Sequence, residues 1–168
     1  MVKPEIEYSR LEHPMNETLD RTDIAILRTL QKNAKLTTKE LAEAVHLTST
    51  PVFERQKRLE RQGIIRGYIA VLDAAKLDRA FIAFCSVKLS RMNHDIALDF
   101  NRRIAEIPEV TECYNISGDY DYLLKINVRD MAQYQQILLE KLGTIESLGS
   151  LKSSFVMGEV KHEYGICL

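Results

Sequence analysis

The sequence predicts an α+β protein made of a three-helix domain over residues 19–66 and a second domain over residues 80–162 with the element order βαββαβ. Three observations predict this division. Apolar residues recur at helical spacing between helix-capping residues as far as Gly63. Beyond residue 80, segments in which apolar and polar residues alternate, as in strands, are interspersed with segments in which apolar residues have helical spacing. The charge also changes sign: residues 19–79 hold twelve basic and eight acidic side chains, whereas residues 80–168 hold nine and twelve.

The composition is that of an ordinary globular protein. Of the 168 residues, 45% are hydrophobic and 28% are charged, which excludes a disordered chain, and seven Gly with four Pro exclude a collagen-like one. The longest uninterrupted apolar stretch, residues 80–85, is too short to span a membrane. The first eighteen residues are not a signal peptide, so we expect a cytoplasmic protein without disulfides between Cys85, Cys113 and Cys167.

Residues 1–18 mix charges with two prolines and show no periodicity, which predicts a flexible N-terminal arm. The first helix follows Asp20, a good N-cap, and its apolar face fades near Asn33. The second helix opens with a capping box, in which Thr37 and Glu40 can bond each other's backbone amides.

The third helix opens within Thr48-Ser49-Thr50, where each residue is a candidate cap, and Pro51 suits its first turn. Gly63 is a good left-handed residue to end it. We expect its inward face to carry Val52, Gln56 and Leu59.

Two helices joined by about four residues, the second opening with small hydroxyl side chains, are typical of a helix-turn-helix. In that motif the second helix places its first turns in the major groove, where Arg can read guanine and Lys can neutralise phosphates. A plain three-helix bundle with a solvated charged face is the alternative. The candidate DNA-contacting residues are Thr38, Thr48, Ser49, Thr50, Val52, Glu54, Arg55, Lys57 and Arg58.

Residues 67–79 are expected to form a strand and a hinge between the two domains. Ile64-Ile65 and residues 68–72 are strand-like, with Gly67 as a bulge, so the first domain is predicted to be a winged helix-turn-helix. The apolar content of this segment predicts that it packs on something, such as the same segment of a second chain.

The second domain opens with a strand over residues 81–89 that is apolar on both faces and therefore central. A helix with Ile96, Phe100 and Ile104 on one face follows and ends at Pro108. Alternation over residues 110–117 and 122–128, around Gly118-Asp119, predicts a hairpin. A second helix from Tyr134 to Leu142 and a last strand over residues 151–157 complete a ferredoxin-like fold, and residues 163–168 are left as a C-terminal tail.

Two helices cover only one face of a four-stranded sheet, and the other face still carries apolar residues. We therefore expect a homodimer with a twofold axis. Such a dimer presents two recognition helices to a palindromic site, with half-sites about 34 Å or a multiple apart.

Residues 118–122, Gly-Asp-Tyr-Asp-Tyr, stand out in the second domain, since glycine allows close backbone access and two carboxylates could hold an ammonium group. A plain hairpin turn is the other interpretation, and the pattern alone favours it. The four histidines are scattered and no nucleotide, zinc or nucleophile motif is found, so we expect no metal, no cofactor and no enzyme activity.

Several stretches in this order resemble the Lrp/AsnC family, the feast/famine regulators of bacteria and archaea, and most closely its leucine-responsive members. The resemblance covers residues 19 to about 163, and it is carried by residues 19–23 (LDRTD), 40–42 (ELA), 59–65 (LERQGII), 67–68 (GY), 117–124 (SGDYDYLL) and 156–161 (VMGEVK).

The resemblance implies a DNA-binding N-terminal domain, a C-terminal domain that senses amino acids, and dimers that assemble into rings, often octamers. It implies an effector site between dimers, with Asp119 and Asp121 beside the amino group of the ligand and backbone amides near Gly118 facing its carboxylate. The expected effector-binding set is Gly118, Asp119, Tyr120, Asp121, Met131, Ser153, Phe155 and Val156.

Two departures from the family pattern are visible. Many relatives have Thr-x-Thr in the last strand where this chain has Leu151-Lys152-Ser153, and residues 53–56 are more acidic than in the leucine-responsive regulator. The resulting hypothesis is a sequence-specific transcriptional regulator whose DNA binding or assembly responds to an amino acid such as leucine. The alternatives are an enzyme like the sirohaem decarboxylases, which share the architecture, and a weakly specific architectural DNA-binding oligomer.

Overall fold

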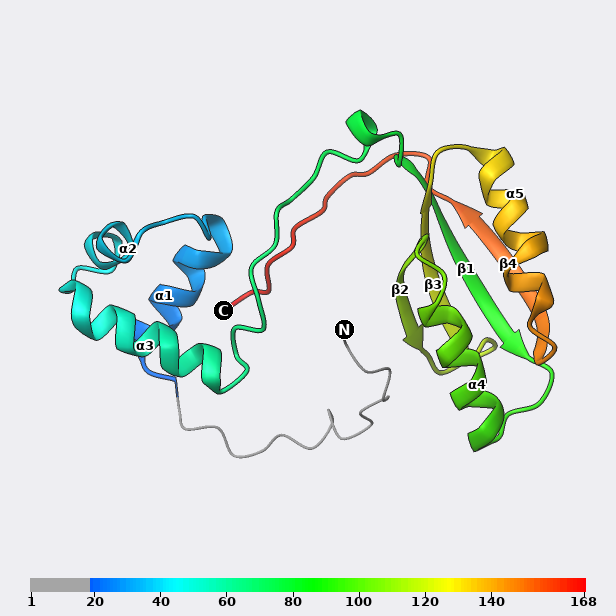
Figure 1. Ribbon diagram of the computed structural model, residues 1–168, viewed down its shortest axis with the longest axis horizontal. Coiled ribbons are helices and arrows are strands. Elements are labelled where there is room, and N and C mark those ends of the chain that lie inside the picture. Colours follow the sequence, from blue (N-terminus) through cyan, green and yellow to red (C-terminus); the bar gives the residue numbers. More distant parts are fainter. Residues whose placement is uncertain (1–18) are drawn as a thin grey trace. The chain divides into compact units, whose positions relative to one another are not determined.

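The computed structural model describes residues 19–168, so the arm expected over residues 1–18 lies outside the described residues. The described chain falls into two compact units (Figure 1). Residues 19–71 and 160–168 belong to one, and residues 72–159 belong to the other. Each unit has its own hydrophobic core.

The helical unit contains α1 (Arg21–Lys32), α2 (Thr38–Ala44) and α3 (Ser49–Arg61). The predicted caps are confirmed at α1 and α2: Asp20 forms a capping box with Asp23, and Thr37 forms one with Glu40. Helix α3 begins after Thr48, whose side chain makes no capping hydrogen bond. Gly63 follows the helix at φ +71°, in the left-handed region that favours glycine.

The core of this unit is built from the facing sides of the three helices. Its buried residues are Ile26, Leu27, Leu30, Leu41, Ala42, Val52 and Leu59. The end of the chain joins this core, because Leu168 packs against it and its carbonyl oxygen accepts a hydrogen bond from Arg28 Nε at 2.9 Å. The expected C-terminal tail is therefore part of the helical unit.

One charged side chain is buried in this core. Asp23 on α1 is only 1% exposed, and its two carboxylate oxygens accept hydrogen bonds from Arg55 at 2.9 Å and Arg58 at 2.6 Å. Both arginines come from α3. A buried carboxylate is tolerated when it is paired and hydrogen-bonded, so this cluster links α1 to α3.

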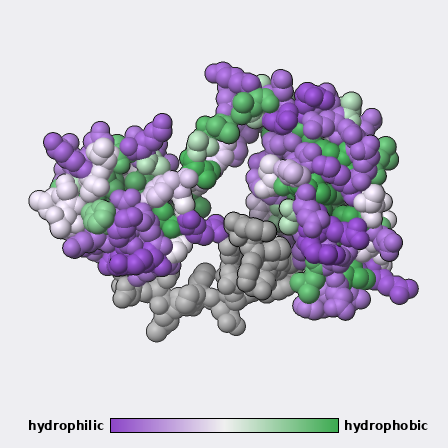
Figure 2. Space-filling view, in the orientation of Figure 1, coloured by the Kyte–Doolittle hydropathy of each residue, from purple (hydrophilic) through white to green (hydrophobic). Residues whose placement is uncertain are grey.

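The strand predicted over residues 64–65 and 68–72 is wrong for the single chain, and so is the bulge at Gly67. Residues 66–73 are extended but pair with no strand among the described residues, and β structure requires such a partner. The segment exposes apolar side chains, with Ile69 at 75% and Leu72 at 65%, and hydrophobic colour appears along it (Figure 2). A short 3₁₀ turn, η2 (Ala75–Leu77), follows.

The second unit confirms the ferredoxin-like prediction. Its elements are β1 (Phe81–Leu89), α4 (His94–Ala105), β2 (Val110–Asn115), β3 (Tyr122–Val128), α5 (Met131–Glu140), η3 (Leu142–Thr144) and β4 (Leu148–Phe155). The antiparallel sheet has the order β2-β3-β1-β4, with β1 in the interior as predicted (Figure 1). Two predicted ends shift, because Leu142 lies in η3 instead of α5, and Met157 lies beyond β4 with 97% exposure.

Both helices cover the same face of the sheet. The core side of β1 and β3 is fully buried under α4 and α5, with Phe100 and Tyr122 in ring contact at 4.6 Å between centroids. The opposite face is only partly covered. It carries Ile82, Phe84 and Leu123 next to a Lys125–Glu112 ion pair of 2.8 Å.

In the part of the chain that is described, none of the helices combines the length and apolar character that crossing a bilayer would require.

We predict that Asp23→Asn lowers the free energy of unfolding of the helical unit by about 1–3 kcal/mol, because the amide cannot serve two guanidinium groups as the carboxylate does. Urea denaturation followed by circular dichroism measures this change. Glu43→Gln is the matched control, since it neutralises an exposed carboxylate on α2 in the same unit and should change stability by less than about 0.5 kcal/mol. Equal stability of the two variants would contradict a structural role for Asp23.

Candidate nucleic-acid interface and ligand loop

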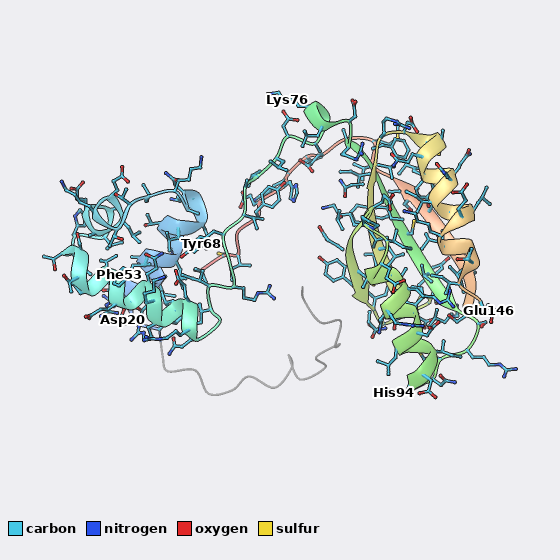
Figure 3. The ribbon with its side chains drawn as sticks, in the orientation of Figure 1. Asp20, Phe53, Tyr68, Lys76, His94 and Glu146 are labelled. Carbon is cyan, nitrogen blue, oxygen red and sulfur yellow. The ribbon has the colours of Figure 1, made fainter. Side chains whose placement is uncertain are left out.

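The outward face of α3 combines small hydroxyl residues, an aromatic ring and charged groups. Ser49, Thr50, Phe53, Glu54 and Lys57 are all exposed, and they lie in the first three turns of the helix. Of these residues, Phe53 is labelled in Figure 3. Four of them belong to the predicted DNA-contacting set. Because the Thr48 side chain makes no capping hydrogen bond, the first amides of α3 do not donate to it and can donate to a phosphate oxygen.

Val52 is misplaced in the predicted DNA-contacting set. Its side chain is 0% exposed in the core between the helices, so it has no path to DNA. The spacing of Val52 and Leu59, seven residues apart, had already placed both on the inward face, and the structure confirms that face. Thr38, at the start of α2, is half-buried.

Arg55 and Arg58 also have a different position from the one expected for base-reading residues. Arg55 Nη1 lies 2.5 Å from Asp20 Oδ2 and 2.9 Å from Asp23 Oδ1, and Arg58 Nη2 lies 2.6 Å from Asp23 Oδ2. The hydrogen bonds that Arg55 donates to Asp20 and Asp23 raise the pKa of Arg55. The Asp23 backbone amide and Arg55 lower the pKa of Asp20. Both arginines therefore hold α3 against α1.

Lys57 is the cation that remains on the outward face of these turns. Its Nζ lies 2.7 Å from Glu60 Oε2 and 5.8 Å from the centroid of the Phe53 ring. Glu60 raises the pKa of Lys57, which stays charged. The pair is half-exposed, and exposed pairs of this kind contribute little to stability, so Lys57 can exchange its partner for a phosphate at small cost.

Gln56 faces the segment that follows the helix. Its Nε2 donates to the Tyr68 hydroxyl at 2.8 Å, and that hydroxyl donates to Glu60 Oε1 at 2.9 Å. These bonds hold the start of the extended segment against α3.

The loop from Gly118 to Asp121 joins β2 to β3 and is anchored on the end of β1. The amide of Leu89 donates to Asp121 Oδ2 at 2.8 Å, and the amide of Asp121 donates to the Val87 carbonyl at 2.9 Å. Lys88 Nζ donates to the carbonyl of Asp119 at 2.9 Å. One oxygen of Asp121 is thus committed to the fold, whereas the exposed Asp119 carboxylate has no hydrogen-bond or ion-pair partner among residues 19–168.

The other predicted effector residues gather elsewhere on the same sheet. The Ser153 hydroxyl lies 2.5 Å from the Tyr134 hydroxyl, which lies 2.9 Å from the buried Cys85 sulfur. Burial raises the pKa of Tyr134, so its hydroxyl stays protonated at neutral pH. Phe155 packs on Tyr134 edge to face, at 5.3 Å between ring centroids. Met131 and Val156 are partly exposed, at 40% and 37%.

A single chain places Asp121 and Val156 near opposite ends of β1, whereas Ser153 pairs with Cys85, two residues from Val87. Asp121 bonds the β1 backbone at Val87, whereas the amide of Val156 donates to the carbonyl of Ile82. Five residues of β1 separate these points, which corresponds to about 16 Å along the strand. One amino acid is too small to touch both ends.

Sequence reasoning missed two features of these sites. Asp23 was not singled out, although its position three residues after Asp20 is the capping-box spacing that could have drawn attention to it. Tyr134 was treated only as part of an apolar helix face, and no local pattern marks its hydroxyl as the link between Cys85 and Ser153.

Comparison with known families assigns both units. Residues 19–66 match the model of a winged helix-turn-helix DNA-binding domain, and residues 82–166 match the model of the Lrp/AsnC ligand-binding domain. The chain belongs to the Lrp/AsnC family. Its members with both domains are DNA-binding regulators with an amino-acid ligand-binding domain, and this Lrp/AsnC chain has the same two domains in the same order.

Relatives of this Lrp/AsnC chain include the leucine-responsive regulatory protein of Haemophilus influenzae, which is 40% identical over 155 residues, or 92% of this chain and 93% of that protein. The protein of the same name from Escherichia coli K12 is 41% identical over 143 residues, or 85% and 87%.

Solved structures agree with this assignment. A Neisseria meningitidis transcriptional regulator in complex with L-Met is similar with a TM-score of 0.86 at 37% identity, covering 89% of this chain and 97% of that one. An AsnC family regulator from Agrobacterium tumefaciens gives a TM-score of 0.85 at 34% identity, with the same coverage.

We predict that Gly118→Ala destabilises the second unit by about 1–2 kcal/mol, because φ at this residue is +120° and an L side chain is strained there. Gly158→Ala is the matched control: a Cβ at either position meets no atom within 4 Å, but Gly158 has no positive φ. Thermal denaturation of the two variants and the wild type measures the difference. If Gly118→Ala has the same melting temperature as Gly158→Ala, the loop does not require a glycine at the positive φ of residue 118.

Proposed function

We propose that this protein is a sequence-specific DNA-binding transcriptional regulator whose DNA binding or assembly responds to a small amino-acid effector. The observation that carries the proposal is the outward face of α3. This face exposes hydroxyl groups, Glu54 and Lys57, and Asp23 of α1 holds the opposite side of the helix through Arg55 and Arg58. The same chain contains the ligand-binding domain of the family. Such a regulator works where the chromosome is, which is the bacterial or archaeal cytoplasm.

The proposed DNA contacts follow from exposure. Thr48, Ser49 and the first amides of α3 bind a phosphate, while Thr50, Glu54 and Lys57 face the groove, and Thr38 touches the neighbouring backbone. Arg55 and Arg58 act through the position of α3, and their exposed fractions of 30% and 39% leave room for an additional contact to phosphate.

The proposed assembly is a dimer that forms a larger ring of the octamer type. The partly covered sheet face and the exposed apolar segment 66–73 are the surfaces that a second copy would cover. A twofold dimer carries two α3 helices, so the operator is palindromic.

The effector site is proposed to be shared between copies. Gly118 to Asp121 of one chain would hold the amino and carboxylate groups of the ligand, while Met131, Ser153, Phe155 and Val156 of another chain would receive its side chain. The separation of about 16 Å along β1 between the backbone partners of Asp121 and Val156 within one chain supports this division. The ligand and DNA each favour one assembly state of the protein. Each therefore changes the affinity of the protein for the other by the same factor, typically about 5- to 150-fold.

We also propose that the protein is not an enzyme, because the relatives with which it aligns over most of its length are named as regulators. No feature of the described residues favours the sirohaem decarboxylase alternative. The architectural alternative is separated by the experiment that follows.

We predict that the protein selects related palindromes from a pool of random duplexes, and binds them at least about 10³-fold more tightly than random DNA at one fixed salt concentration. Equal affinity for selected and random DNA would reject sequence-specific regulation and favour the architectural alternative. Lys57→Ala should weaken binding to all duplexes and lower the slope of log affinity against log salt by about one per α3. Lys76→Ala is the matched control, since Lys76 is also an exposed lysine in an i,i+3 ion pair but lies outside α3.

We predict that Asp119→Asn weakens binding of leucine or methionine by about tenfold or more in isothermal titration calorimetry, because a charge-assisted hydrogen bond to the ammonium is lost. Glu106→Gln, at an exposed carboxylate that precedes β2 whereas the loop follows β2, should bind like the wild type. Mixing Asp119→Asn with Ser153→Ala, after dissociation and reassembly, should restore a fraction of wild-type sites if two copies build each site. No restoration would place the whole site within one chain.

A further inference from the structure

Phe53 is the large apolar side chain that α3 leaves in solvent within its first two turns. It is 48% exposed, whereas the adjacent Val52 is 0% exposed. A single exposed apolar residue needs no explanation by itself, so the residues around Phe53 must indicate whether it has a function.

The neighbours of Phe53 at a spacing of one helical turn on this face, three or four residues away, are small or positively charged. Ser49 and Thr50 precede it by four and three residues, and Lys57 follows it by four, so all three share its side of the helix. The Lys57 ammonium lies 5.8 Å from the centroid of the ring. The ring is therefore the most protruding apolar group on a face that also carries a phosphate-compatible cation.

The arginines nearest to Phe53 do not share this face. Arg55 is held by Asp20 and Asp23, and Arg58 is held by Asp23, on the side of α3 that packs towards α1. Bidentate reading of guanine requires a free guanidinium in the groove. The first turns of α3 consequently offer a ring where an arginine-based reader offers a guanidinium.

A phenyl ring in the major groove has one base-specific partner. Thymine alone among the four bases presents a methyl group there, and apolar side chains recognise it by contact. We propose that Phe53 is a specificity-determining residue that packs on a thymine C5-methyl group in each half-site. This inference rests on the proposed function, since it requires α3 to enter the major groove.

The test uses the full chain and the duplex selected from the random pool as probe. Each thymine in turn is replaced by deoxyuridine, which removes only the methyl group and leaves base pairing unchanged. At one position in each half-site, wild-type affinity should fall by about fourfold, the effect of one apolar carbon leaving a buried contact. Phe53→Ala should bind the thymine and the deoxyuridine duplexes equally, at about the wild-type affinity for deoxyuridine or below.

Two further variants make the assignment specific. Phe53→Leu keeps an apolar side chain and should retain part of the methyl effect. Lys57→Ala should lower the affinity for both the thymine and the deoxyuridine duplex and leave the ratio of the two affinities unchanged. Phe53 is exposed, so circular dichroism should show an unchanged fold for its variants.

The inference is overturned if no deoxyuridine substitution weakens the wild type, or if Phe53→Ala keeps the same thymine-to-deoxyuridine ratio. A wild type that selects no sequence from the pool would instead show that the proposed function fails. The two failures are thus distinguished by the first step of the experiment.

Discussion

The buried carboxylate of Asp23 fixes how α3 packs in the helical unit. A charge with 1% exposure is stable only if its partners compensate for lost water, and here two guanidinium groups do so, one to each oxygen. Because both partners come from α3, the rotation of α3 about its axis is fixed relative to α1. That rotation decides which side chains α3 presents, and it turns Phe53, Glu54 and Lys57 outward while it turns Val52 and Leu59 into the core.

A comparable constraint fixes the loop of the second unit. Asp121 is bonded through its carboxylate and its backbone to the end of β1, and Gly118 supplies the positive φ that the turn requires. The loop is therefore a defined surface with an exposed Asp119 carboxylate. The same sheet keeps Phe155 and Val156 near the other end of β1, so the residues that the family resemblance groups together are separated in one chain.

Both units leave apolar surface that a single copy does not cover. Residues 66–73 have no strand partner in the described chain, and the face of the sheet opposite α4 and α5 carries Ile82, Phe84 and Leu123. In both places, apolar side chains of the described residues 19–168 remain exposed or only partly covered. They agree with a function in which assembly and ligand binding are coupled.

Local structure and fold class could be predicted from the amino-acid sequence. Asp20 as an N-cap and the Thr37–Glu40 capping box are local features, so these helix starts were readable from the chain. Apolar residues on both faces identified β1 as an interior strand. Family motifs then pointed to the Lrp/AsnC architecture.

Tertiary structure decided what the functional side chains do. Arg55 meets Asp20 across 35 residues, and no local pattern distinguishes an arginine that binds a neighbouring helix from one that reads a base. Whether residues 68–72 form a strand depends on a partner that local sequence cannot supply, and the distance between Asp121 and Val156 depends on strand register. The physical reason is the same in each case: helix caps and periodicity depend on neighbours along the chain, whereas ion pairs, strand pairing and site geometry depend on segments that only folding brings together.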